Sequence, residues 1–126
     1  MKNYEEIFKA LGDKTRLRIM HLLIGTETEI CGCEFVDSLE ESQYNISRHI
    51  RVLKHAGLIN ERKEGRWVYC SVTDRQDSFK KTLYKLIASI PKDIVKKDQK
   101  RFKKRLDIRV KGKCLLGIQN KRFAKT

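Results

Sequence analysis

The stretch of residues 42–72 constrains the fold most, because a helical pattern leads directly into two strand-like runs. In residues 43–55, apolar side chains recur at helical spacing and polar side chains occupy the other positions. Ser42 is expected to cap this helix and Gly57 to end it. A turn at residues 63–66 then predicts a β-hairpin. The predicted strands of the hairpin are residues 58–62 and 67–72.

The residues before this stretch predict three shorter helices. Apolar residues recur at helical spacing on both sides of Gly12-Asp13, which divides them into two helices. Asp13 is expected to cap the second helix and Gly25 to end it. A third helix is predicted for residues 33–39, whose apolar side chains form a one-sided stripe. The fold class is therefore mainly α with a small β-hairpin, in the element order of a winged helix-turn-helix.

The C-terminal part of the chain is strongly basic. Residues 80–126 hold 17 of the 29 Lys and Arg residues and 3 of the 16 acidic ones. Apolar spacing predicts a helix over residues 79–90 that Pro91 ends, and the lysine-rich residues 92–105 are expected to form a helix followed by a loosely ordered tail. The net charge of +13 indicates an anionic partner, and DNA is the usual one. The predicted units are a DNA-binding and dimerisation domain at residues 1–90 and a basic C-terminal extension at residues 91–126.

Several functional classes are not expected. No apolar run approaches the ~20 residues that span a bilayer, and no apolar targeting segment begins the sequence, so we expect a cytoplasmic protein without membrane contact. In that reducing compartment, cysteines are expected as thiols or metal ligands. The sequence has no Gly-rich phosphate loop, no His-Glu-x-x-His and no nucleophile elbow, so neither an enzyme nor a catalytic cofactor is predicted.

Three motifs resemble the ArsR family of thiol-based metal and metalloid sensors. They are Phe-Lys-Ala-Leu-Gly-Asp-Lys-Thr-Arg-Leu-Arg-Ile at residues 8–19, the Ser-Gln start and Ile-Ser-Arg-His-Ile core of a segment at residues 42–59, and Glu-Arg with Gly-Arg-Trp-Val-Tyr at residues 61–69. The similarity covers roughly residues 5–74. It implies a homodimeric, ligand-responsive transcriptional repressor that binds double-stranded operator DNA. It also implies that helices near residues 4–11 and 79–90 form the dimer interface.

The resemblance places the recognition helix at residues 43–55, with its polar N-terminal residues in the major groove. Amide and guanidinium groups can bond to purine edges, whereas other basic residues suit phosphates. Solvation alone would also account for a polar helix face. The predicted base readers are Gln43, Asn45, Ser47 and Arg48, and the predicted phosphate contacts are Arg51, Lys54, Arg62, Lys63 and Arg66.

The Cys31-Gly32-Cys33 motif resembles the inducer site of family members that sense arsenic, cadmium or lead. Thiolates suit such ions, so the expected inducer is As(III) or a soft divalent ion. Residues two apart on an ideal helix point ~200° from each other, so joint ligation is expected to need a non-helical turn at Gly32. Some relatives carry a third cysteine where this sequence has Val36. Cys114, from the same or the partner subunit, is the predicted third ligand instead.

The remaining cysteine and the histidines are not expected to bind metal. Cys70 lies in a strand pattern and is expected in the core, as is His21, whereas His49 and His55 are expected as polar surface residues. A histidine and carboxylate site on the C-terminal dimer helix, which other family members use, cannot be built because all three histidines precede residue 79.

Three alternatives remain open at this stage. Cys33 and Cys114 could merely pack as small apolar residues. The Cys-x-Cys pair could form a disulfide in a redox switch. The protein could also be a constitutive basic nucleic-acid-binding module without a ligand. Neither the ion nor the operator follows from the sequence.

Overall fold

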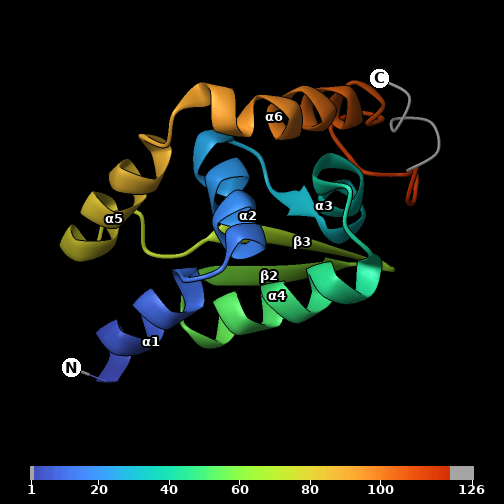
Figure 1. Cartoon of the computed structure of the whole chain (residues 1–126). Coiled ribbons are helices and arrows are strands. Elements are labelled where there is room, and N and C mark those ends of the chain that lie inside the picture. Colours follow the sequence, from blue (N-terminus) through green and yellow to red (C-terminus); the bar gives the residue numbers. More distant parts are fainter. Residues whose placement is uncertain (1, 120–126) are drawn as a thin grey trace.

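The structure is a computed structural model and describes residues 2–119. It is mainly helical with one small antiparallel sheet (Figure 1). The helices of the described part are α1 (Lys2–Leu11), α2 (Lys14–Gly25), α3 (Gly32–Leu39), α4 (Gln43–His55), α5 (Ser78–Ala88) and α6 (Lys92–Asp107). The strands are β1 (Ile30–Cys31), β2 (Ile59–Glu64) and β3 (Trp67–Val72).

The predicted helix boundaries are confirmed where a side chain or a glycine sets them. The Asp13 carboxylate accepts hydrogen bonds from the backbone N–H groups of Thr15 and Arg16, at 2.9 and 3.1 Å, and so caps α2. The Ser42 hydroxyl accepts from the backbone of Asn45 at 3.1 Å and caps α4. Gly57, with φ of +80°, follows the end of α4 in the left-handed region that glycine tolerates.

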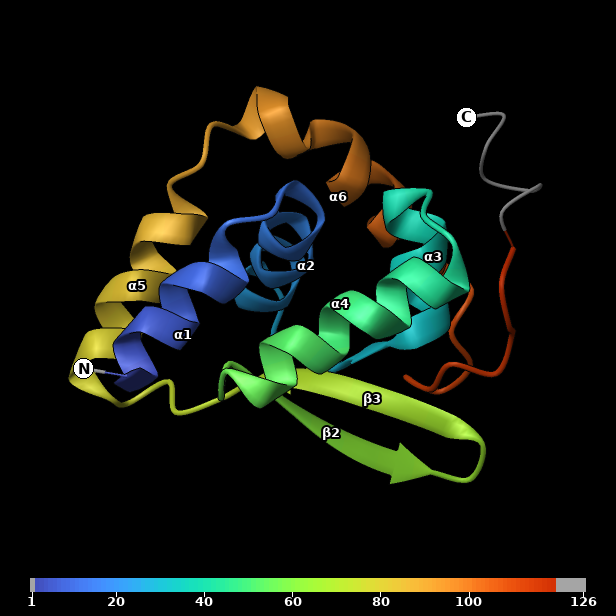
Figure 2. The same ribbon diagram turned by 60° about the horizontal axis from the view of Figure 1, so that its bottom comes forward.

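The sheet differs in two ways from the prediction. β2 and β3 pair from Ile59 opposite Val72 to Glu64 opposite Trp67, so the ladder extends beyond the predicted strand end. The turn is therefore only two residues long, and the four-residue tip predicted at 63–66 was too wide. β1 was not predicted; it pairs with β3 and places the third strand at the edge, in the order β1-β3-β2. Figure 2 shows the hairpin and α4 side by side.

One main hydrophobic core joins α1 to α5 and the hairpin, and it also contains Phe102 of α6. Cys70 lies in this core and His21 is buried beside it, as predicted. The prediction that His49 lies at the surface is wrong. His49 is buried, and its Nδ1 lies 3.2 Å from an Arg16 guanidinium nitrogen. The reason is that His49 lies on the face of α4 that packs toward the start of α2, where it is also 3.9 Å from the Asp13 carboxylate.

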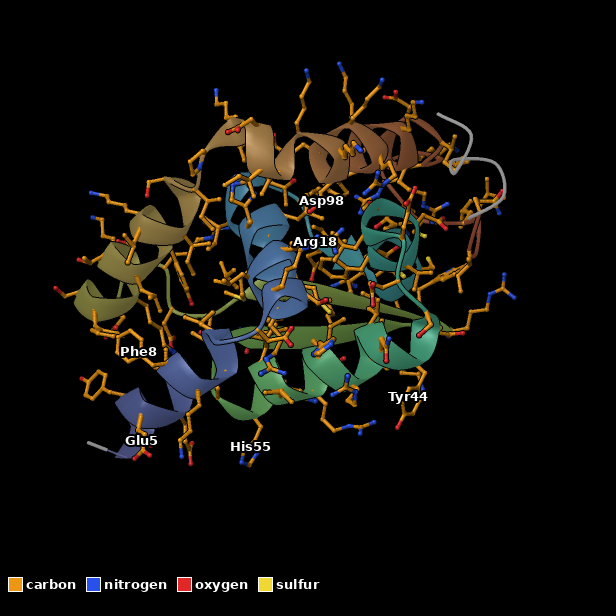
Figure 3. The ribbon with its side chains drawn as sticks, in the orientation of Figure 1. Glu5, Phe8, Arg18, Tyr44, His55 and Asp98 are labelled. Carbon is orange, nitrogen blue, oxygen red and sulfur yellow. The ribbon has the colours of Figure 1, made fainter. Side chains whose placement is uncertain are left out.

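The predicted helix after Pro91 is confirmed, and α6 crosses over α2 and α3 (Figure 1). Its buried face carries charged as well as apolar side chains. Arg18 of α2 and Asp98 of α6 point toward each other in Figure 3 and form a bidentate ion pair, with N–O distances of 2.8 and 2.7 Å. Arg18 also donates to the Leu39 carbonyl at the end of α3. This arginine therefore links α2, α3 and α6.

The segment after α6 returns along α3. Gln119 donates its backbone N–H to both Asp37 oxygens at 2.8 Å, and Cys114 is buried. The predicted loose tail is therefore packed as far as residue 119, and its remainder, residues 120–126, lies outside the described residues. The predicted boundary between residues 90 and 91 stays a prediction, although Phe102 packs into the same core as α1 to α5. Within residues 2–119, none of the helices has the length and apolar character needed to cross a bilayer.

Candidate metal centre and nucleic-acid interface

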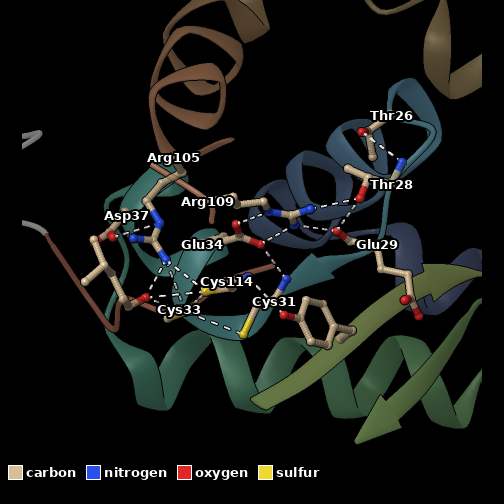
Figure 4. A network of polar contacts seen from close by, with 12 residues as sticks. Thr26, Thr28, Glu29, Cys31, Cys33, Glu34, Asp37, Arg105, Arg109 and Cys114 are labelled. Carbon is tan, nitrogen blue, oxygen red and sulfur yellow. Dashed lines mark hydrogen bonds and ion pairs between the residues drawn. The ribbon is translucent and has the colours of Figure 1, made fainter. Parts of the chain in front are cut away.

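Three cysteine sulfurs meet at the start of α3 (Figure 4). Cys33 Sγ lies 3.5 Å from Cys31 Sγ and 3.3 Å from Cys114 Sγ, and all three atoms lie within 4.8 Å of one another. Zinc–thiolate bonds are about 2.3 Å long, so two sulfurs bound to one zinc ion lie at most about 4.6 Å apart. The two contacts of Cys33 lie well within this limit, so the three sulfurs are close enough together to become ligands of a single ion. No other group of three ligand-bearing side chains gathers in this way among residues 2–119.

The backbone at Cys31 allows the first two sulfurs to converge. Cys31 is extended, with φ −79° and ψ 150°, and pairs with Tyr69 of β3, whereas Cys33 already lies in the first turn of α3. The backbone therefore changes direction between Cys31, where β1 ends, and Gly32, where α3 begins. The expected distortion at Gly32 was therefore wrong: Gly32 is the first helical residue, and a side chain there would meet no atom within 4 Å.

The third sulfur is brought in by the segment after α6. A β-bridge between Val110 and Lys113 turns the chain, with Gly112 at φ +75°. The backbone N–H of Cys114 then donates to the Tyr69 hydroxyl at 3.0 Å. Cys31, Tyr69 and Cys114 form a small apolar cluster separate from the main core. Tyr69 thus pairs with Cys31 through its backbone and contacts the backbone of Cys114 through its hydroxyl.

Two arginines of the basic C-terminal segment, whose side chains are 1% and 7% exposed, lie beside the cluster, and the sequence patterns did not predict either. Arg105 donates from Nη2 to Cys33 Sγ at 3.3 Å and to Cys114 Sγ at 3.2 Å. Arg109 forms a bidentate pair with Glu34, with N–O distances of 2.7 and 2.6 Å. Glu34 in turn accepts from the Cys31 backbone at 2.8 Å.

A helical stripe in α6 contained the missed signal. Val95, Asp98, Phe102 and Arg105 follow each other at intervals of three or four residues and are all buried. That spacing marks one helix face, and the two charged members occupy positions where apolar residues would be expected. A lysine-rich stretch is usually solvated on all sides, so the charges in it gave no reason to single out Asp98 or Arg105.

The three clustered thiols shift one another's pKa values in opposite directions. The neighbouring thiols of Cys114 and then of Cys33 lower the pKa of Cys31. The Cys114 thiol raises the pKa of Cys33, and the Cys31 thiol raises that of Cys114. Cys70 lies outside the cluster, and burial raises its pKa to about 12, so it is a poor thiolate donor.

The predicted DNA-contacting residues lie on α4 and on the hairpin. Tyr44 and His55 project from α4 away from the body of the molecule in Figure 3, and they show which side of α4 is open. The exposed predicted residues are Gln43, Ser47, Arg48, Arg51 and Lys54 on α4, and Arg62, Lys63 and Arg66 on the hairpin. Asn45 is half-buried, with its amide 3.4 Å from Glu41.

Some of these cations have internal partners. Arg62 forms an ion pair with Glu29 at 2.7 Å and lies over the Tyr69 ring, 4.9 Å from its centre. Lys54 pairs with Glu61 at 2.9 Å. Exposed ion pairs of this kind contribute little to stability, so DNA phosphates can compete with the two glutamates for Arg62 and Lys54.

A cavity of about 430 Å³ connects the sulfur cluster with these two elements. It is lined by Cys31 and Cys33, by Ser47 and Arg51 of α4, and by Trp67 of β3. The cavity therefore has Cys31 and Cys33 on one side and the predicted DNA-contacting elements, α4 and the hairpin, on the other.

The chain is similar in sequence and in fold to known transcriptional regulators. Residues 13–61 match the family described as "Bacterial regulatory protein, arsR family". An uncharacterized HTH-type transcriptional regulator of Methanocaldococcus jannaschii, MJ1325, is 44% identical over 77 residues, which cover 59% of this chain and 85% of that protein. The chain belongs to the ArsR family. It is a transcriptional regulator with a winged helix-turn-helix fold, not an enzyme.

Other ArsR-family relatives are matched over a shorter part of their length. The arsenic resistance transcriptional regulator ArsR1 of Pseudomonas putida is 51% identical over 63 residues, which cover 50% of this chain and 48% of that protein. The matched segment thus spans about half of that relative. Among solved structures, reduced HlyU of Vibrio cholerae superimposes with a TM-score of 0.59 at 28% identity, covering 68% of this chain and 85% of HlyU.

Proposed function

We propose that this protein is a homodimeric repressor that leaves its operator DNA when As(III), or another thiophilic ion, binds Cys31, Cys33 and Cys114. The convergence of three sulfurs from β1, α3 and the C-terminal segment carries the proposal. Soft thiolates favour such ions over hard ones. The similarity to regulators named for arsenic resistance supports the same ligand class.

The contacts of the thiols provide a path to the DNA-binding elements. Cys31 pairs with Tyr69 in the β2–β3 hairpin, which is the wing of the fold. Cys33 lies on α3, which leads through a short turn to the Ser42 cap of α4. An ion that draws the three sulfurs together pulls on β1, α3 and the C-terminal segment at once. Release requires the ion to favour the low-affinity state by about 1–3 kcal/mol, the usual size of an allosteric coupling.

The exposed residues of α4 and the wing supply the DNA contacts in this proposal. Arg48 is exposed and lies within 3.4 Å of the buried His49 ring, which limits its motion and suits a base reader. Lys63 and Arg66 lie near the wing tip and suit phosphates. Gln43, Asn45, Ser47, Arg51, Lys54 and Arg62 complete the proposed interface.

Exposed aromatic and aliphatic side chains support the proposed dimer. Phe8 of α1 and Leu86 of α5 are 57% and 66% exposed, and Tyr4 packs edge-on against Phe79 beside them. Large apolar side chains gathered on one face indicate an interface. A second copy that covers α1 and α5 would match the two-fold symmetry of a pseudo-palindromic operator.

An As(III) titration of the protein–DNA complex tests the proposal. The probe is a fluorescent duplex from the region upstream of the protein's own coding sequence, and the readout is its anisotropy. We expect arsenite to release wild type, and Cys31→Ser and Cys33→Ser to abolish the response. Cys70→Ala, which removes a buried thiol outside the cluster, is the matched control. A normal response of Cys31→Ser would show that the site is misplaced, whereas a normal response of Cys114→Ser alone would show that the Cys31–Cys33 pair acts without it.

The 3.3 Å contact between Cys33 and Cys114 sulfurs favours one alternative, a redox switch. Hydrogen peroxide would oxidise these two thiols to a disulfide and be reduced to two waters. Release of DNA by peroxide, with no release by As(III), Cd(II) or Pb(II), would establish this alternative and refute metal sensing.

A further inference from the structure

We propose that the buried Arg105–Asp37 pair determines which ionic charge the thiol cluster accepts, and that it favours a trivalent thiophile over a divalent one. The inference rests on the proposed function, because it assumes that the three thiols hold the ligand. It adds a selectivity determinant that lies outside the cysteines.

Arg105 lies directly against the cluster. Its side chain is 1% exposed, and its Nη2 contacts the sulfurs of Cys33 and Cys114. Its Nε lies 3.4 Å from a carboxylate oxygen of Asp37, whose side chain is fully buried. Within the described residues, Nε and Nη1 of Arg105 have no hydrogen-bond partner, so the contact with Asp37 is mainly one of charge. Figure 4 shows the guanidinium between Asp37 and the sulfurs.

A second buried pair lies on the other side of the cluster. Glu34 is completely buried, and its carboxylate is 2.6 Å from an Arg109 nitrogen. The groups around the sulfurs thus comprise two cations and two carboxylates. Their formal charges cancel, so these two ion pairs offer no net charge to offset that of a bound ion.

The charge of the loaded cluster then depends on the ion. Arsenite, As(OH)3, exchanges its three hydroxyl groups for three thiol sulfurs, and the thiol protons leave with them as three waters. The product is neutral. A divalent ion such as Cd(II) displaces three thiol protons but brings only two positive charges, so the product carries one negative charge. An uncompensated buried charge is costly, because it loses its hydration.

Asp37 is the residue that prevents Arg105 from compensating the negative charge of a divalent complex. Arg105 alone would offset the negative charge of a three-thiolate divalent complex, since it touches two of the sulfurs. Asp37 already pairs with Arg105 and cancels that advantage. Removing the charge of Asp37 should therefore improve the binding of divalent ions relative to As(III).

The test compares arsenite and Cd(II) affinities of the reduced full-length protein by competition, followed through ultraviolet sulfur-to-metal charge-transfer absorbance. We expect wild type to prefer As(III). We expect Asp37→Asn to shift the As(III)-to-Cd(II) affinity ratio toward Cd(II) by about tenfold or more, the effect of a nearby charge in a poorly hydrated site. The control is Asp98→Asn, which removes another buried carboxylate paired with arginine, and we expect it to change the ratio by less than about twofold.

Two further variants keep the proposal testable if Asp37→Asn does not fold, as judged by circular dichroism. Glu34→Gln raises the site charge by one unit and should shift the ratio in the same direction, whereas Arg105→Gln lowers it and should shift the ratio toward As(III). Binding of both ions with a ratio that none of these variants moves, or a wild-type preference for Cd(II), would overturn the proposal. Absence of charge-transfer absorbance with either ion in wild type would instead refute the proposed function.

Discussion

Replacing Phe102 with alanine tests whether α6 is part of the DNA-binding domain or an appended extension. The Phe102 side chain belongs to the main core and is 7% exposed. Truncating a buried phenylalanine usually costs about 3–5 kcal/mol, through lost apolar burial and the cavity left behind. Domains of this size are stable by about 5–15 kcal/mol, so the loss would be a large part of the total.

Urea unfolding followed by circular dichroism measures this loss. We expect Phe102→Ala to unfold in one transition at a much lower urea concentration than wild type, because α6 and the rest of the core share one cluster. Lys103→Ala changes the neighbouring exposed residue and should shift stability by no more than about 0.5 kcal/mol. A loss below about 1 kcal/mol for Phe102→Ala, or two separate transitions in wild type, would refute the shared core and support a division near residue 90.

Two other predictions concern DNA binding and assembly. Arg48→Ala should weaken binding to the operator more than to random duplex, whereas Lys63→Ala should weaken both alike and reduce the dependence of affinity on salt. Equal losses for Arg48→Ala on the two duplexes in anisotropy titrations would show that it reads no base. Phe8→Glu should convert the proposed dimer to monomers at micromolar concentration, because it places a charge in the exposed apolar face of α1. Sedimentation velocity measures this, and a wild type that sediments as a monomer would contradict the dimer itself.

Signals that act over a few residues predicted the fold well. Asp13, Ser42 and Gly57 mark helix ends through their own hydrogen bonds or backbone angles, and the structure confirms each. Strand β1 escaped prediction because it has only two residues, and its pairing depends on β3, which lies about 40 residues further along the sequence. His49 was misplaced because a polar residue on a helix gives no sign of the arginine and carboxylate that cover it.

The sequence was less informative about the surroundings of the candidate site. The resemblance of Cys31-Gly32-Cys33 to the inducer site of family members singled out these two cysteines, and Cys114 was the best remaining candidate because Cys70 lies in a strand pattern. The buried roles of Arg105 and Arg109 depend on contacts with α3, more than 70 residues earlier in the chain. Residue type alone does not distinguish these two arginines from the other basic residues of the segment. The helical spacing with Phe102 sets Arg105 apart, whereas no such pattern marks Arg109.

The distance along the chain between the clustered thiols has a mechanical consequence. Cys33 and Cys114 are 81 residues apart, and the segment between them contains α4, the wing, α5 and α6. In the proposed complex, the backbone and the thiolate bonds close a ring around the entire DNA-reading part of the chain. A crosslink across a loop of this length disfavours the unfolded chain by about 4–5 kcal/mol in the loop-entropy treatment. A protease that cuts once within the wing would open this ring, but the two fragments would stay tethered until a chelating dithiol removed the ion.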